Sequence, residues 1–306
     1  MITDRVRLTG FLLLLGTGWG LTQPLIKITV TAGYQPLGMI FWQMLIGAVL
    51  LGMLRWRHLR HLQITRKTLA IWVMIATIGS LIPGITSYRA AFHLPSGIMS
   101  IVIATIPMMA FPIALALGND TFSRRRLLGL ILGLIGVGFI ALPDASLPER
   151  AMIAFLPLAL IAPFCYACEG NIVARWGTAG LDPFAVLFGA SAIGAVISLP
   201  LAIGSGQFFF PRSPFILADV TLTLSSVIHV LVYTGYVWLI GRAGAVFAGQ
   251  VSYVVTGSGV LWAMLLLGET YSLWIWVALM CMILGLMLVQ PRLADAPTVG
   301  ETKSYG

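Results

Sequence analysis

Charged residues are scarce in this chain, and their scarcity excludes most water-soluble folds. Aspartate, glutamate, lysine and arginine together make up 9% of its 306 residues, whereas hydrophobic residues make up 59%. A soluble protein carries about 25% charged residues, because its surface must face water. The composition therefore predicts a protein that crosses a membrane several times.

Cysteines and motifs for cofactors or catalysis are also few. Cys165, Cys168 and Cys281 lie within apolar runs, and the Cys165-Cys168 pair lacks the further soft ligands of a metal site. The chain contains no G-x-x-x-x-G-K-[ST] nucleotide loop, no H-E-x-x-H motif and no pair of carboxylates inside an apolar run. We therefore expect no catalytic residues, no metal and no cofactor, and we do not expect an enzyme.

Ten apolar runs have about the length that crosses a bilayer core of roughly 30 Å at 1.5 Å per residue. The first of them is too long for a signal peptide, so we expect an uncleaved span. The sequence thus predicts an all-α integral membrane protein with ten transmembrane helices. The predicted spans are 8–28, 36–54, 68–88, 95–117, 127–142, 153–174, 183–203, 218–240, 243–267 and 272–290.

One pattern occurs twice, about 150 residues apart, and divides the chain into halves. A long apolar run ends at Gly118-Asn119-Asp120 and another ends at Gly268-Glu269, and a glycine-bearing apolar run follows each corner. Five spans per half is an odd number, so the second half must enter the membrane from the opposite side. We expect two inverted repeats, 1–146 and 147–290, around a central cavity, and a disordered cytoplasmic tail at 291–306.

The positive charges are distributed unevenly between the predicted loops. Of the 18 lysines and arginines, all but Lys27, Arg89, Arg150 and Arg212 fall on the side of the N-terminus. By the positive-inside rule both termini are expected in the cytoplasm, in a multi-pass protein of a bacterial inner membrane. The net charge of +8 is thus explained by orientation among membrane lipids, and no nucleic-acid partner is expected.

Polar residues fall on one face of several spans, which predicts a shared cavity between the halves. Serine, threonine and glycine faces also serve close helix packing, as in the G-x-x-x-G of Gly129 and Gly133, so both interpretations stay open for single hydroxyls. The candidate substrate-binding residues are Trp19, Gln23, Ser80, Tyr88, Met99, His229, Tyr233, Gln250 and Tyr253.

Glu169 is the only carboxylate well inside a predicted span. It is a candidate for proton coupling or for cation binding, because an ionisable group in the membrane is costly unless it has a function or a partner. The structural alternative is that it pairs with Arg175, about two turns further along the helix. His229, whose imidazole titrates near neutral pH in water, is assigned to hydrogen bonding with the substrate.

The order of several short motifs resembles the drug/metabolite transporter superfamily, specifically its EamA-type ten-helix exporters. The first corner departs from the family pattern, because Asn119-Asp120 stands where the family usually shows Gly-Glu. The resemblance implies a secondary exporter that works by alternating access, and the overall likeness is to bacterial amino-acid exporters, including those for aromatic amino acids. The motifs are Trp19-Gly20 with Pro24, Pro107, Leu267-Gly268-Glu269, and the glycines Gly129, Gly136 and Gly285.

The candidate cavity residues also bear on the substrate, which we expect to be a small molecule. They are aromatic side chains and uncharged hydrogen-bonding groups, without a lysine or arginine for a phosphate. An amphipathic zwitterion such as an amino acid fits them best. The alternatives are a hydrophobic cationic drug, held by aromatic rings and Glu169, and a passive channel in place of a carrier.

Overall fold

The computed structural model describes residues 2–59, 62, 64–143, 146–211, 215–243 and 245–289, and all regular structure within them is helical. The predicted tail at 291–306 lies outside the described residues. The elements are α1 (Ile2–Thr31), α2 (Pro36–Leu59), α3 (Arg66–Ala76), the π-helix η1 (Thr77–Leu81), α4 (Ile82–His93), α5 (Ser96–Ile103), α6 (Ile106–Ala116), α7 (Arg124–Ala141), the 3-10 helix η2 (Arg150–Phe155), α8 (Leu156–Trp176), α9 (Pro183–Gly204), α10 (Leu217–Ala243), α11 (Ala245–Gly249), α12 (Val251–Leu267) and α13 (Leu273–Val289).

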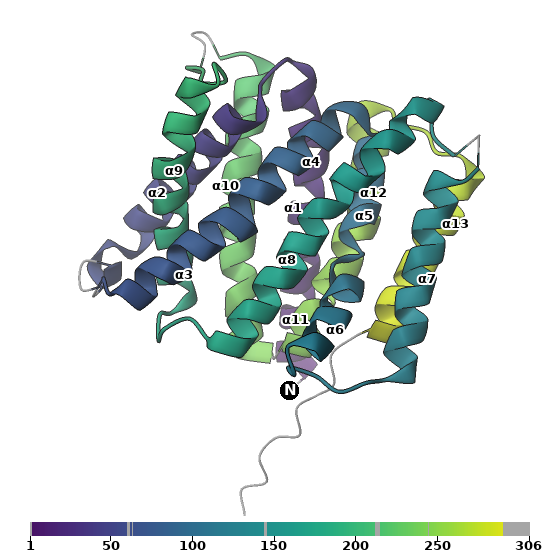
Figure 1. The fold of residues 1–306 in the computed structure, drawn as a ribbon, viewed down its shortest axis with the longest axis horizontal. Coiled ribbons are helices and arrows are strands. Elements are labelled where there is room, and N and C mark those ends of the chain that lie inside the picture. Colours follow the sequence, from purple (N-terminus) through teal and green to yellow (C-terminus); the bar gives the residue numbers. More distant parts are fainter. Residues whose placement is uncertain are drawn as a thin grey trace, which may run out of the picture.

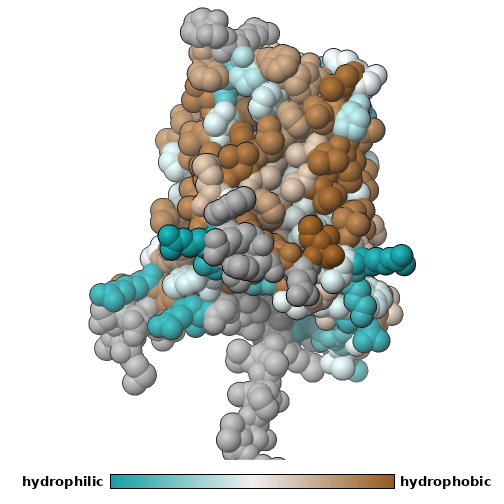
Figure 2. All heavy atoms as spheres, turned by 90° about the vertical axis from the view of Figure 1, so that its left-hand side faces the viewer, coloured by the Kyte–Doolittle hydropathy of each residue, from teal (hydrophilic) through white to brown (hydrophobic). Residues whose placement is uncertain are grey.

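These helices form the ten predicted spans. Among the described residues, eight helical segments are long and apolar enough to cross a membrane, and α7 and the shorter apolar α13 complete the set. The third span is built of α3, η1 and α4, the fourth of α5 and α6, and the ninth of α11 and α12. The predicted all-α membrane fold is therefore confirmed. Apolar side chains cover most of the face shown in Figure 2, and hydrophilic ones gather at its lower end.

Each span packs against partners equivalent to those of its counterpart in the other half, which lies five spans away in the sequence. The first span (α1) packs on α10 and α12, which belong to the eighth and ninth; the sixth (α8) packs on α4 and α6, which belong to the third and fourth. The pairs α2 with α9 and α7 with α13 map onto themselves and stand at opposite sides of the molecule (Figure 1). The two halves therefore repeat one structure and pack against each other throughout.

Glycines allow α7 and α13 to approach closely. A Cβ atom added at Gly129 would lie 2.6 Å from the carbonyl oxygen of Gly285, and one added at Gly285 would lie 2.7 Å from that of Gly129. A Cβ at Gly133 would overlap the side chain of Met108. The packing interpretation of this G-x-x-x-G motif is confirmed, because a neighbouring helix fills the space where a side chain of either glycine would lie.

Both predicted corners are formed by a glycine in the left-handed conformation. Gly118 has φ +68° and Gly268 has φ +66°, values that residues with a Cβ adopt rarely. The backbone N–H of Asn119 bonds back to Ala114, and that of Glu269 is directed to Ala263. The sequence signature of the repeat thus marks the same turn twice.

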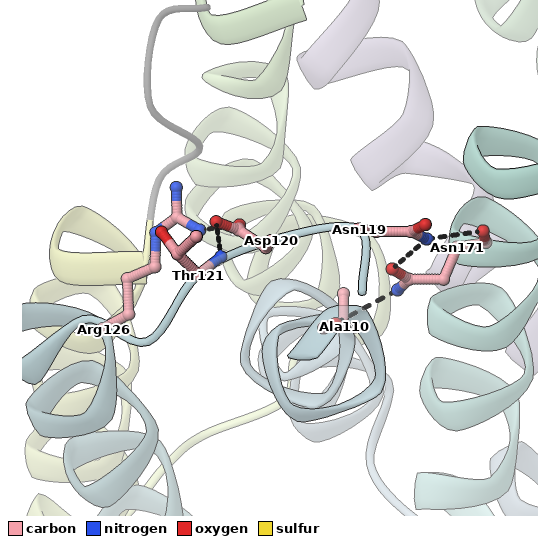
Figure 3. Close-up of polar contacts among 6 residues, drawn as sticks. All are labelled: Ala110, Asn119, Asp120, Thr121, Arg126 and Asn171. Atoms are coloured by element: carbon pink, nitrogen blue, oxygen red, sulfur yellow. Dashed lines mark hydrogen bonds and ion pairs between the residues drawn. The ribbon is translucent and has the colours of Figure 1, made fainter. Parts of the chain in front are cut away.

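The side chains at the first corner point in opposite directions, as Figure 3 shows. The amide of Asn119 donates to the backbone carbonyl of Asn171 in α8 at 2.9 Å, and the side chain of Asn171 donates in turn to Ala110 in α6 at 3.1 Å. Asp120 forms an ion pair with Arg126, which is only 5% exposed. The sequence predicted Arg126 as a loop charge; burial beside Asp120 gives it a structural role instead.

Lys27, one of the four basic residues predicted on the side away from the N-terminus, contacts another span. It lies inside α1, and its ammonium donates to the carbonyls of Ala91, Phe92 and Leu94 at 2.7, 2.9 and 3.0 Å. These carbonyls end α4 and have no partner within the helix, so a cation there is stabilising. Lys27 therefore links the first span to the end of the third by hydrogen bonds.

Candidate substrate-binding site

Glu169 lies where α8 crosses the π-helix of the third span. A Cβ added at Gly79 in η1 would lie 2.6 Å from Oε2 of Glu169, so the carboxylate rests directly on this glycine. In η1 the N–H of Ile82 bonds to the carbonyl of Thr77, five residues earlier. Such π-helical turns often occur at functional sites.

The carboxylate of Glu169 has no hydrogen-bond donor and no ion-pair partner among the residues that the structure describes. Arg175, the structural alternative, is exposed towards the end of α8 and does not pair with it. An ionisable group without a partner inside a membrane-spanning helix is, on physical grounds, a candidate functional group.

Four aromatic rings meet between α1 and α10. The ring centroid of Trp19 lies 5.9 Å from that of His229, 5.9 Å from that of Tyr233 and 5.8 Å from that of Tyr236, each in an edge arrangement. His229 and Tyr233 are stacked at 6.2 Å. Trp19, His229 and Tyr233 were predicted as site residues, and Tyr236 falls on the same helical arc.

These rings extend towards the carboxylate. Tyr233 is close enough to interact electrostatically with Glu169 and with Tyr166, both on α8. Tyr166 interacts in the same way with Tyr88 of α4, whose hydroxyl donates to Oε1 of Gln43. We name the following residues the aromatic–carboxylate cluster: Trp19, Tyr166, Glu169, His229, Tyr233 and Tyr236.

Every member of the cluster is partly exposed, and none has a hydrogen-bond partner within the described chain. Other hydroxyls on the polar faces of α10 and α12 behave differently: Ser225, Ser226 and Thr256 each donate to a carbonyl of their own helix. Buried polar groups are nearly always paired. The polar faces therefore carry two kinds of polar side chain: hydroxyls that hydrogen-bond within their own helix, and the cluster, whose polar groups are available to a ligand.

The remaining predicted residues are placed less uniformly. Ser80 lies in η1 beside Gly79, and Gln23 lies half-buried about one turn from Trp19. Met99 is 4% exposed and packs in the main hydrophobic core, against which Tyr253 also packs. Gln250 is exposed between α11 and α12. Met99 in the core and exposed Gln250 lie outside the aromatic–carboxylate cluster as the described residues form it.

Charge in the cluster is of one sign. Its interactions join aromatic rings, hydroxyls and one carboxylate, and none that the described residues form involves lysine or arginine. An ammonium or another cation is the complementary ligand for a carboxylate between ring faces. A phosphate would find no fixed cation in this cluster.

Ten spans in two repeated halves define a multi-pass membrane protein, and a polar cluster without hydrogen-bond partners among the described residues lies where the halves meet. The sequence profile of the EamA-like transporter family matches residues 9–142 and 154–290. The chain therefore belongs to the EamA-like transporter family, which comprises membrane transporters of small molecules.

Comparison with solved structures supports the fold. One crystal structure of a protein has a TM-score of 0.61 and 16% sequence identity, and the match covers 93% of this chain and 97% of that chain. A comparison with curated proteins finds no match.

Proposed function

We propose that this protein is a secondary transporter that exports small amphipathic metabolites, above all amino acids, by alternating access. The observation that carries this proposal is the aromatic–carboxylate cluster. It joins α1 of the first repeat to α8 and α10 of the second, and its polar groups have no partner within the described chain. A site between two repeats that can rock against each other is accessible from each side in turn.

The chemistry of the cluster suits an amphipathic molecule with an amino group. Ring faces of Trp19 and Tyr233 offer apolar contact, and their N–H and O–H groups, with the amide of Gln23, can donate to a carboxylate. Glu169 supplies the only charge. Because a carboxylate and rings also bind hydrophobic cations, export of cationic drugs is the second candidate.

The proposal extends to the boundaries and orientation of the repeats. We propose repeats at 1–146 and 147–290 in a bacterial inner membrane, with both termini in the cytoplasm. The exposed Arg57, Arg66 and Lys67 lie at the junction of α2 and α3, at one end of the molecule, and support this orientation.

Single cysteines test the orientation. In a variant whose three native cysteines are replaced by alanine, Lys67→Cys is expected to react with a membrane-impermeant maleimide only from the cytoplasmic side. Phe210→Cys, at a position that is 74% exposed in the connection between α9 and α10, is expected to react only from outside. Reaction of both positions from one side contradicts the inverted arrangement.

Transport itself is tested with purified protein in liposomes. Vesicles loaded with unlabelled phenylalanine are expected to accumulate labelled phenylalanine transiently and saturably, because a carrier exchanges substrate through one site. A channel gives no such counterflow, and absence of uptake for a panel of amino acids contradicts the proposed substrate class.

The same vesicles decide the role of protons. A pH gradient is expected to change the initial rate for the wild type and for His229→Asn, which binds substrate more weakly. Glu169→Gln is expected to remove the effect, because the carboxylate is then permanently neutral. Equal pH dependence in Glu169→Gln contradicts coupling at this residue.

A further inference from the structure

We infer that Glu169 binds the ammonium group of the substrate, so that an amine cation is required and N-acylated analogues are rejected. This inference rests on the proposed function, which it deepens by naming the chemical group that selects the substrate.

The carboxylate is the strongest unsatisfied group of the site. Glu169 has no donor or cation among the described residues, and no described group of three or more histidine, cysteine, aspartate or glutamate side chains that could hold a metal ion is found. A carboxylate out of bulk water needs a partner that carries both hydrogen-bond donors and positive charge. An ammonium group supplies three donors and one charge in the volume of a methyl group.

The surroundings of Glu169 complete such a subsite. Tyr166 and Tyr233 both interact electrostatically with Glu169, and neither hydroxyl has a protein partner in the described part of the chain. A phenol oxygen can accept an N–H group of an ammonium and an aromatic ring attracts its charge, so both residues suit a cation held near this carboxylate. Trp19 contacts Tyr233 edge to face and offers apolar surface beside it for the rest of a substrate.

Gly79 leaves the space that the carboxylate of Glu169 occupies. A Cβ at this position would lie 2.6–2.7 Å from both oxygens and from the Cδ atom of Glu169, so alanine there displaces the carboxylate without changing its charge. Gly79 is therefore a positioning residue for the subsite. An N-acyl group on the substrate removes the positive charge and adds bulk at the point where the carboxylate meets the helix.

Three related compounds separate the two ends of an amino acid: phenylalanine, phenethylamine without the carboxylate, and N-acetylphenylalanine without the ammonium. Equilibrium binding is measured on the purified protein in detergent. We expect the wild type to bind the first two at least about tenfold more tightly than the third. In Glu169→Gln the affinity for phenylalanine and phenethylamine falls to that for N-acetylphenylalanine, which itself stays unchanged.

Two further variants keep the result interpretable. Glu149→Gln removes an equal charge from an exposed residue before η2 and is expected to bind like the wild type. Gly79→Ala keeps the charge of Glu169 and is expected to lose most of the preference for the free amine. Thermal stability measured without ligand separates this loss from misfolding.

Three results overturn the inference. If the wild type binds N-acetylphenylalanine as tightly as phenylalanine while transporting phenylalanine, the ammonium subsite is wrong and the proposed function stands. If Glu169→Gln weakens binding of all three compounds equally, Glu169 has a structural role. If none of the three binds or is transported, the proposed substrate class fails, and the inference fails with it.

Discussion

Trp19→Ala is expected to lower transport by about 30-fold or more, while the protein still folds. Trp19 joins His229, Tyr233 and Tyr236 through three ring contacts, and its indole N–H has no partner among the described residues. Removing a tryptophan anchor from the centre of a binding site costs about 2 kcal/mol or more, and each 1.4 kcal/mol is a factor of ten in affinity.

Trp238→Ala is the matched control for this change. Trp238 lies on α10 five residues after Tyr233, but it is 50% exposed and contacts Phe11 outside the cluster. Its removal is expected to leave the rate of counterflow within about a factor of two, because it lies outside the site. Initial rates of counterflow and the melting temperature are compared for both variants. Equal loss of transport in the two variants, or loss of stability in Trp19→Ala alone, contradicts the binding role of Trp19.

Periodicity was sufficient to predict the spans and the arcs of the aromatic residues. Apolar length alone locates helices that cross a bilayer, and the two glycines Gly118 and Gly268 mark the repeat because a left-handed turn requires them. The stacking of His229 on Tyr233 follows from their spacing of four residues on one helix.

The contacts between helices could not be predicted in this way. A helical wheel assigns a face to each residue but does not say which helix that face meets. The approach of Glu169 to Gly79 depends on the crossing of α8 with the third span, and the π-helical turn at η1 has no clear signal in the sequence. Gln250 was placed on a continuous ninth span, but the separation of α11 from α12 leaves it exposed.

The second corner holds the two halves together at the start of α5. Glu269 accepts hydrogen bonds from the backbone N–H groups of Ser96 at 2.7 Å and Gly97 at 3.1 Å, at the start of α5. A carboxylate at a helix N-terminus satisfies unpaired donors and interacts favourably with the helix dipole. Tyr271 donates to Oε2 of Glu269 at 2.5 Å. Burial and this hydrogen bond raise the pKa of Tyr271, so its hydroxyl stays a donor at physiological pH.

The corresponding acid of the first repeat has no such role. Asp120 pairs with Arg126 in its own half, and Asn119 instead connects the corner to α8. The second corner therefore binds the start of α5, whereas the first corner makes no equivalent contact through its acid. Any movement that separates α5 from this corner must break two hydrogen bonds to one carboxylate.

Glu269→Gln is accordingly expected to loosen the corner and expose the start of α5. A neutral amide can accept from only one of the two N–H groups and presents its own donor to the other, which costs about 1–3 kcal/mol for the buried group left unpaired. Ser96, at 1% exposure, reports on this directly. In the cysteine-free variant, Ser96→Cys is expected to react with an impermeant maleimide at least about tenfold faster when Glu269→Gln is added. Adding Glu149→Gln in its place is expected to leave the rate unchanged, and an equally slow reaction with Glu269→Gln would show that the corner does not protect the start of α5.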